Sequence, residues 1–259
     1  MSNVEESNSS IQVLERAFQI IEVLANCREK VTLAEVSSLT GIPKSTTFRI
    51  LKSLQEKELV GQTPGGQYYM TYRICAIAKK VLDKTSIISI AKPYIERLSS
   101  SVHSTINLVV REGNESVYVY RENDPDSPFK MTSVVGNRRP LHTSAVGKSI
   151  LAGLSDNEIL SYWNSSSKPK ITPYTITDFD TLFNEIKTIR TLGYAMDNQE
   201  NTLGVKCIAA CIPNYLGKPE YAISISCPLE TLTEERIKEY VPFLLSTKSS
   251  ISAAMGSST

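Results

Sequence analysis

Histidine, serine, lysine and glycine stand close together in the run RPLHTSAVGKS (139–149), so two kinds of catalysis have to be considered. GKS also occurs in phosphate-binding loops, but that motif requires a glycine five positions before Gly147, where this chain has His142. Ser144 and His142 could be a nucleophile and its base, yet two residues this close in sequence do not gain hydrogen-bond geometry from their spacing, and no third orienting group is identifiable. We therefore predict no catalytic residue here and a protein that is not an enzyme.

The same run predicts the start of a helix, over about 144–154, and a helix start can bind an anion. The first backbone N–H groups of a helix lack partners within it, and the helix dipole favours negative charge there. A small carboxylate could dock on the amides of Ala145 and Val146. The alternative, which the residues leave open, is that Ser144 caps the helix and does nothing more.

Polar side chains in two later strand-like runs could line the same pocket. Ser224 and Ser226 are two apart and should point to one face of their strand, as should Cys207 and Cys211 on the preceding one. Inward hydroxyl groups are costly unless they are hydrogen-bonded. Asp197 precedes the strand pair and could accept a hydrogen bond from a ligand hydroxyl.

Metal binding by these cysteines is not expected. Cys207 and Cys211 would lie about 13 Å apart on a strand, too far for one tetrahedral ion. The chain has 5 cysteines and 2 histidines, and this odd number of cysteines shows no disulfide-framework spacing. We predict reduced thiols, no metal and no cofactor.

The run GIPKSTTFRILKSLQEKELV (41–60) predicts a different site. Phe48, Leu51 and Leu54 recur along one side of a helix, and Arg49 and Lys52 fall on the other. Between positions 30 and 80 there are 8 Lys or Arg residues against 3 Asp or Glu residues, although the net charge of the whole chain is +1. Basic charge is therefore concentrated around this helix.

The elements around this helix predict a winged helix-turn-helix. A helix is expected over 11–25, where Leu14 and Phe18 have helical spacing, and a second helix should lie between a Thr32–Glu35 capping box and Gly41. A Gly-rich hairpin after position 60 would form the wing. The third helix could then enter the major groove, although a polar helix face can also be merely solvated. The candidate DNA-binding residues are Lys44, Ser45, Thr46, Thr47, Arg49, Lys52, Gln62, Gln67 and Tyr68.

The rest of the chain predicts an α+β domain. Residues 71–100 are expected to be helical with one interruption, at Pro93, and a helical linker is placed at 73–87. Strands are expected over 105–112 and 116–122, joined at Gly113, and over FKMTSVV (129–135), VKCIAACI and YAISISC. Helices are expected after a Ser155–Glu158 capping box, over 178–192, and after a Thr231–Glu234 capping box. These predictions divide the chain into domains at 1–72, 73–87 and 88–259.

Length and composition are those of an ordinary globular protein. The 259 residues suit two domains, and no apolar run reaches the roughly 18 residues of a membrane span. The first residues, MSNVEESNSS, are polar and acidic rather than basic and then apolar, as a secretory signal would be. We expect a cytoplasmic protein with no membrane partner.

Three runs resemble the IclR family of bacterial transcriptional regulators: LAEVSSLTGIPKSTTFRILKSL, GNRRPLHTSAVGKSILA, and GYAMDNQENTLGVKCIAACI with YAISISCP. The resemblance covers nearly the whole chain. It implies a winged helix-turn-helix joined by a helix to a GAF-like effector-binding domain with a mainly antiparallel sheet, assembled as a homodimer or a dimer of dimers. The family positions that line the effector site match Met131, Ala145, Val146, Asp197, Cys207, Ser224 and Ser226.

The resemblance also implies a function. We expect a regulator, with repression favoured over activation, that binds pseudo-palindromic double-stranded operator DNA and responds to a small carboxylate such as a sugar-derived keto acid. Asn198 and Gln199 occupy positions that are commonly acidic in the family, which changes the charge near the pocket mouth. The alternative is an enzyme or carrier whose first domain is a protein-interaction module.

Overall fold

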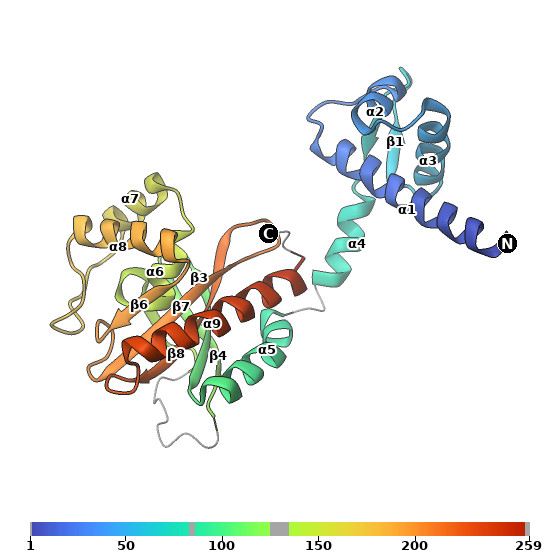
Figure 1. Ribbon diagram of the computed structural model, residues 1–259. Coiled ribbons are helices and arrows are strands. Elements are labelled where there is room, and N and C mark those ends of the chain that lie inside the picture. The colour runs from blue at the N-terminus through green and yellow to red at the C-terminus, as the bar shows by residue number, and fades with distance from the viewer. Residues whose placement is uncertain (1, 83–85, 125–134, 257–259) are drawn as a thin grey trace. The chain divides into compact units, whose positions relative to one another are not determined.

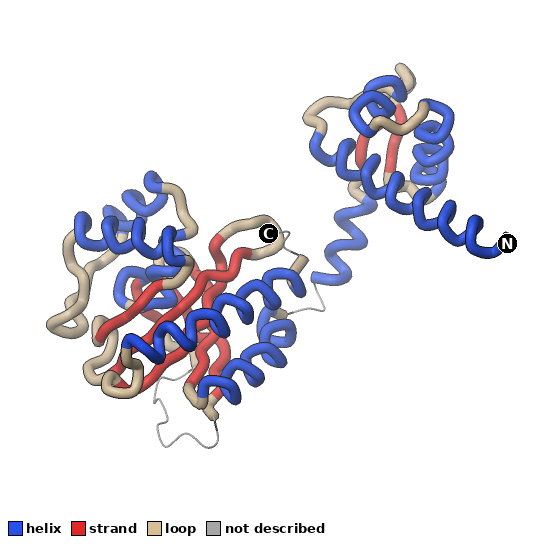
Figure 2. The backbone as a smooth tube through the Cα atoms, in the orientation of Figure 1, coloured by secondary structure: helices blue, strands red, loops and turns tan. Residues whose placement is uncertain are grey.

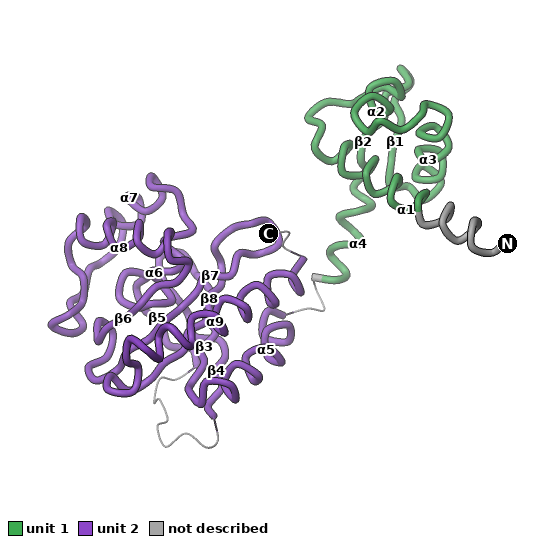
Figure 3. Tube along the Cα trace, viewed as in Figure 1, with its two compact units in different colours: residues 1–85 green, residues 86–259 purple. Residues whose placement is uncertain are grey.

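The chain forms two compact units, Met1–Thr85 and Ser86–Thr259, in a computed structural model that describes residues 2–82, 86–124 and 135–256 (Figure 3). Each unit has its own apolar core. The helix α4, which lies within the segment predicted as a linker, is the last element of unit 1.

Unit 1 has the helix order of a winged helix-turn-helix (Figure 1). Its elements are α1 (Ser2–Asn26), α2 (Leu33–Thr40), α3 (Lys44–Glu56), β1 (Val60–Gln62), β2 (Tyr68–Met70) and α4 (Arg73–Leu82). The Thr32–Glu35 capping box is present, and Gly41 ends α2 at φ +69°, a conformation that glycine adopts without strain. Strands β1 and β2 form the predicted antiparallel hairpin.

The buried face of α3 differs from the predicted one. Leu51 and Leu54 are buried as expected, but Phe48 is 49% exposed, and the core is completed by Thr47 and Ile50. The spacing of these four buried positions, three, one and three residues, follows the 3.6-residue period, whereas a strict three-residue repeat drifts away from it. Phe48 therefore lies at the edge of the buried stripe.

The first helix also buries a different side from the one that its most obvious apolar stripe predicts. The predicted helix is present as part of α1, but Leu14 and Phe18 are 61% and 59% exposed. Ile20 and Leu24 pack into the core instead. Helical spacing shows that a helix forms, and it leaves open which of two apolar stripes faces the core.

Unit 2 is a six-stranded antiparallel sheet covered by helices on both faces (Figures 1 and 2). The strand order is β5–β4–β3–β8–β7–β6. Its elements are α5 (Ile87–Val102), β3 (Thr105–Glu112), β4 (Glu115–Glu122), β5 (Arg138–Pro140), the 3₁₀ turn η1 (Leu141–Thr143), α6 (Ala145–Ala152), α7 (Asp156–Ser165), α8 (Phe179–Leu192), β6 (Ala195–Asn198), β7 (Val205–Pro213), β8 (Pro219–Pro228) and α9 (Glu234–Ala254).

Alternation along β7 explains the two layers of core. Ile208 and Ile212 point to the face covered by α5 and α9, while Cys207, Ala209 and Cys211 point to the face covered by α6, α7 and α8. Successive side chains of a strand must lie on opposite faces. The predicted α+β fold class is thus confirmed, and the polar candidates of β7 lie on the same side as α6.

Two predictions in unit 2 are wrong. Pro93 lies inside α5, which continues past it, and the helix that contains Pro93 starts instead at Ile87, after an extended Ser86 that caps it. Proline removes one hydrogen bond from a helix, and packing of the helix against a core can compensate for that loss. The last helix is capped by Thr233, whose side chain accepts from the Arg236 N–H, and the predicted Thr231 box does not form.

Other local predictions are confirmed. Gly113 adopts φ +60° in the two-residue turn between β3 and β4. The Ser155–Glu158 capping box starts α7, and Gly193 at φ +79° ends α8. The short strands β5 and β6 were not predicted, and most of the predicted strand 129–135 lies outside the described residues.

Candidate functional site

The outer side of α3 presents a basic, hydroxyl-bearing surface. Pro43 precedes the helix, where its fixed φ suits a helix start, and Lys44, Ser45, Arg49 and Lys52 are exposed on its outer side. Arginine can pair with guanine edges or phosphates, and lysine with phosphates. Thr46 is partly exposed beside them. Five of the nine predicted DNA-binding residues thus lie on one accessible helix face.

Two predicted DNA-binding residues cannot contact DNA, because they are buried. Thr47 is 0% exposed, and its hydroxyl donates to the Ile42 carbonyl at 3.1 Å, which ties α3 to the turn before it. Tyr68 is 2% exposed and its backbone pairs with Val31, so it belongs to the core beneath the wing. Both positions were assigned from polarity alone, and each lies on the inward side of its element.

The wing carries the remaining two candidates and one that was missed. Gln62 and Gln67 are exposed; their amides donate to the carbonyls of Gly66 at 3.3 Å and Lys30 at 3.4 Å. Tyr69 is 37% exposed and lies under the Lys30 amine, 4.9 Å from the ring centroid. The alternation of β2 could have identified Tyr69 as the outward aromatic residue.

In unit 2, three predicted effector-site residues lie side by side across three strands. Asp197 on β6 is paired with Cys207 on β7, which is paired with Ser226 on β8. The Cys207 thiol donates to the Ser226 hydroxyl at 3.1 Å. Ser224 lies two residues from Ser226 on the same face, as predicted. Asp197, Ser224 and Ser226 are all at least 96% buried.

Asn107 on β3 completes this ladder and was missed by the sequence reasoning. Its side-chain amide donates to the hydroxyl oxygens of Ser224 at 3.3 Å and Ser226 at 3.1 Å. Its carbonyl oxygen accepts from the Arg121 guanidinium at 3.1 Å. A lone asparagine within the apolar run TINLVV was the available signal, because a polar residue at an inward strand position needs partners. We call Asn107, Cys207, Ser224 and Ser226 the polar ladder.

The amino terminus of α6 lies in the same core layer as Cys207. Ser144 caps the helix by accepting from the Gly147 N–H at 3.3 Å, and Ala145 and Val146 follow it, each 1% exposed. A Cβ on Gly147 would lie 2.1 Å from the Leu141 carbonyl oxygen. Glycine is therefore required here by close backbone packing, which accounts for it without a phosphate loop.

A buried ion cluster connects α6 to the aspartate of β6. Lys148 is 0% exposed; its amine donates to the Glu200 carboxylate at 2.6 Å and pairs with Glu185. The Glu200 N–H donates to Asp197 at 2.7 Å. Burial raises the pKa of Asp197 to about 6 and that of Glu200 to about 7. Sequence reasoning dismissed Lys148 with the phosphate-loop motif and so missed this cluster.

The comparisons with known proteins cover both units. The model of the domain described as "Bacterial transcriptional regulator IclR C-terminal" matches residues 79–253, and that of the "IclR helix-turn-helix domain" matches residues 13–64. The chain belongs to the IclR family.

Relatives of this IclR-family chain are named as repressors. The DNA-binding transcriptional repressor YiaJ of Escherichia coli is 34% identical, over 99% of this chain and 92% of YiaJ. The HTH-type transcriptional repressor AllR of E. coli is 32% identical, over 95% of this chain and 90% of AllR. The crystal structure of the IclR of Thermotoga maritima covers 95% of this chain and 99% of its own, with 29% identity and a TM-score of 0.64.

Membership of the IclR family makes this chain a DNA-binding transcriptional regulator and not an enzyme, so the enzyme alternative is wrong. The surroundings of His142 and Ser144, the pair that the sequence analysis considered and set aside, agree. His142 is 0% exposed, its ring Nδ1 lies 2.7 Å from the Tyr162 hydroxyl, and burial lowers its pKa to about 4. The Ser144 hydroxyl is engaged in capping α6.

Neither a metal site nor a membrane-spanning helix is found among the residues that the structure describes. Within residues 2–82, 86–124 and 135–256, no three His, Cys, Asp or Glu side chains are grouped as they would need to be to hold a metal ion. No helix there combines the length and apolar character needed to cross a lipid bilayer. Met131, the seventh predicted effector-site residue, lies outside the described residues.

Proposed function

We propose that this regulator is a cytoplasmic repressor whose affinity for operator DNA is controlled by a small organic acid, such as a sugar-derived keto acid. The supporting observation is the polar ladder. Four polar side chains, interlocked by hydrogen bonds, lie on the sheet face that α6 covers. Within the ladder the Ser224 and Ser226 hydroxyl oxygens accept hydrogen bonds, so their own O–H groups can donate, and a ligand with carboxylate or carbonyl oxygens is a suitable acceptor.

The acid would bind between the start of α6 and the ladder. The backbone amides of Ala145 and Val146 in the first turn of α6 suit a carboxylate, because the positive end of the helix dipole lies there. Asp197, Ser224 and Ser226 would position the rest of the molecule. With a pKa of about 6, Asp197 is mostly ionised at neutral pH, so its carboxylate would accept a hydrogen bond from a ligand hydroxyl.

DNA would be contacted by α3 and the wing. In a homodimer, two copies of α3 would enter successive major grooves of a pseudo-palindrome, about one helical turn apart. The domain division proposed for this arrangement is 1–72 for DNA binding, 73–87 for the linker and 88–259 for the effector. Such coupling is reciprocal, so operator and effector must alter each other's affinity by the same factor.

A thermal-shift panel of small carboxylates tests the effector site. Wild type and Asp197→Ala are compared at fixed salt and protein concentration, with Asp180→Ala, an exposed position of α8, as the matched control. We expect one acid to raise the melting temperature of wild type and of Asp180→Ala in a concentration-dependent way and to lose that effect in Asp197→Ala. If every acid leaves wild type unchanged, the acid-effector proposal is wrong.

A further inference from the structure

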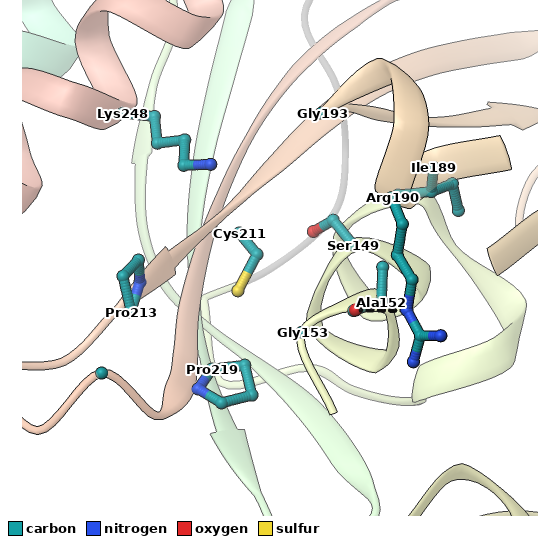
Figure 4. A pocket seen from close by; sticks show the side chains of 11 residues that line it. Ser149, Ala152, Gly153, Ile189, Arg190, Gly193, Cys211, Pro213, Pro219 and Lys248 are labelled. Carbon is teal, nitrogen blue, oxygen red and sulfur yellow. Dashed lines mark hydrogen bonds between the residues drawn. The ribbon is translucent and has the colours of Figure 1, made fainter. Parts of the chain in front are cut away.

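A cavity in unit 2 lies away from the polar ladder. It has a volume of about 280 Å³ and is bordered by the ends of α6 and α8, the last residues of β7 and one side of α9 (Figure 4). The sheet topology explains it. Strand β6 pairs with β7 only as far as Ala209, so β7 runs on through Cys211 to Pro213 without a neighbour on that side.

Besides Arg190, three polar side chains line this cavity, each from a different element. The amine of Lys248 comes from α9, the thiol of Cys211 from β7 and the hydroxyl of Ser149 from α6, and Figure 4 shows them turned toward the same space. Lys248 is partly buried, and among the described residues no acidic side chain forms an ion pair with it. A partly desolvated amine without a counter-ion attracts an anion.

Two helices, α6 and α8, end at this cavity, and the free carbonyl groups at a helix end favour a cation. The amine of Lys248 could therefore be bound by these carbonyl groups rather than by a ligand. Arg190 meets that need. Its guanidinium donates to the carbonyls of Ala152 at 3.0 Å and Leu154 at 2.7 Å and pairs with Asp156 at 2.7 Å. With the end of α6 capped in this way, the amine of Lys248 remains available to a ligand.

The other two groups restrict the chemistry of that ligand. The Ser149 hydroxyl already donates to the Val146 carbonyl at 2.8 Å, so only its lone pairs can serve a ligand, which must supply a donor. Burial raises the pKa of the Cys211 thiol to about 12, so the sulfur stays protonated and acts as a soft apolar wall rather than a nucleophile. A drug-sized pocket takes about 300–1,000 Å³, so a cavity of about 280 Å³ suits a molecule of a few carbons.

We propose that this cavity binds a small hydroxycarboxylate, whose carboxylate pairs with Lys248 and whose hydroxyl donates to Ser149. The site is separate from the acid-effector site proposed at the start of α6, because it lies where that same helix ends. The eight residues of α6 therefore have a candidate acid site at each end.

Calorimetric titration of the full-length protein with glycolate and with glycerate tests the site. We expect saturable binding to wild type that weakens at least about tenfold in Lys248→Met, because a charge-assisted hydrogen bond is lost. Lys248→Arg keeps the charge and should retain much of the affinity. Lys238→Met, on an exposed position of the same helix α9, is the matched control and should bind as wild type does.

Two further comparisons separate this site from the polar ladder and test the role of Ser149. Binding that survives in Asp197→Asn but is lost in Lys248→Met places the acid in the cavity beside Lys248. Loss in Asp197→Asn with none in Lys248→Met assigns the acid to the effector site and overturns the inference, as does a wild type without saturable binding. Ser149→Ala should weaken glycolate but not acetate, which lacks the hydroxyl; equal losses for both acids contradict the assigned hydrogen bond.

Discussion

The outer face of α3 and the polar ladder of unit 2 both consist of polar residues, but these are held in opposite ways. On α3, Arg49 and Lys52 are exposed, so water can replace any contact that they lose. In the ladder, Asn107 is 99% buried and donates hydrogen bonds to the Ser224 and Ser226 hydroxyls. Both serines are buried too, so water could not easily replace these hydrogen bonds. Substitutions on α3 should therefore alter function alone, whereas those in the ladder and its ion cluster should alter stability and function together.

The largest effect that this contrast predicts is at Lys148. Lys148→Met leaves the Glu200 and Glu185 carboxylates without their cation, and removing one partner of a buried ion cluster costs about 3–5 kcal/mol. Trp163 on α7 is the single tryptophan, so its fluorescence during urea unfolding reports on unit 2. Adding Glu200→Gln to Lys148→Met should recover part of the loss. If the free energy of unfolding of Lys148→Met alone lies within about 0.5 kcal/mol of that of wild type, the ion cluster does not stabilise unit 2.

The second effect is a pH dependence at Asp197. Its folded-state pKa of about 6 lies above the ordinary value of 3.8, so the folded state binds the proton more tightly than the unfolded state. The wild type should therefore lose stability as pH rises from about 4 to 6, by up to about 3 kcal/mol from this group, and change little above that. Asp197→Asn removes the titration.

Urea unfolding of both proteins at pH 4 and pH 7 measures this difference. We expect Asp197→Asn to gain stability relative to wild type on going from the lower pH to the higher. Glu200 titrates in the same direction and its N–H donates to Asp197, so the two groups are coupled, and the comparison is repeated in a Glu200→Gln background to isolate Asp197. A difference between the two proteins that is the same at both pH values would mean that Asp197 titrates normally.

The third effect tests the exposed side of the comparison. Arg49→Ala should weaken operator binding by about 1–3 kcal/mol if the guanidinium contacts a base edge, and it should leave unfolding unchanged because Arg49 is exposed. Lys57→Ala, at the far end of α3, is the control, with little change expected. Binding measured over a range of salt concentrations separates base from phosphate contacts, since losing a phosphate contact lowers the salt slope by about one. An Arg49→Ala variant with wild-type affinity would exclude this residue from the interface.

The same contrast explains which features could be predicted from the sequence. Caps and turns were predicted well, because the Thr32–Glu35 box and Gly113 depend on residues only a few positions apart. The fold class followed from strands joined as antiparallel hairpins and mixed with helices. Asn107 and Lys148 were missed because their partners are up to 119 residues away in the chain, and sequence spacing carries no information on such pairs. The exposure of Lys44 and Arg49 followed from helical periodicity alone, and their contact with DNA stays a prediction.

Thr47 and its neighbour Ser45 provide the smallest and sharpest test, because both were assigned to DNA and only one is accessible. Thr47→Val keeps the shape of the side chain but removes the hydroxyl that donates to the Ile42 carbonyl, so unit 1 should lose about 1 kcal/mol of stability. Ser45→Ala should leave stability nearly unchanged and weaken operator binding, since Ser45 is exposed on the face of α3 that we propose contacts DNA. Unfolding curves and operator titrations, corrected for the folded fraction, measure both. If Thr47→Val loses operator affinity at full folding, the hydroxyl acts on DNA through the turn it holds, and the division between exposed and buried polar residues does not extend to α3.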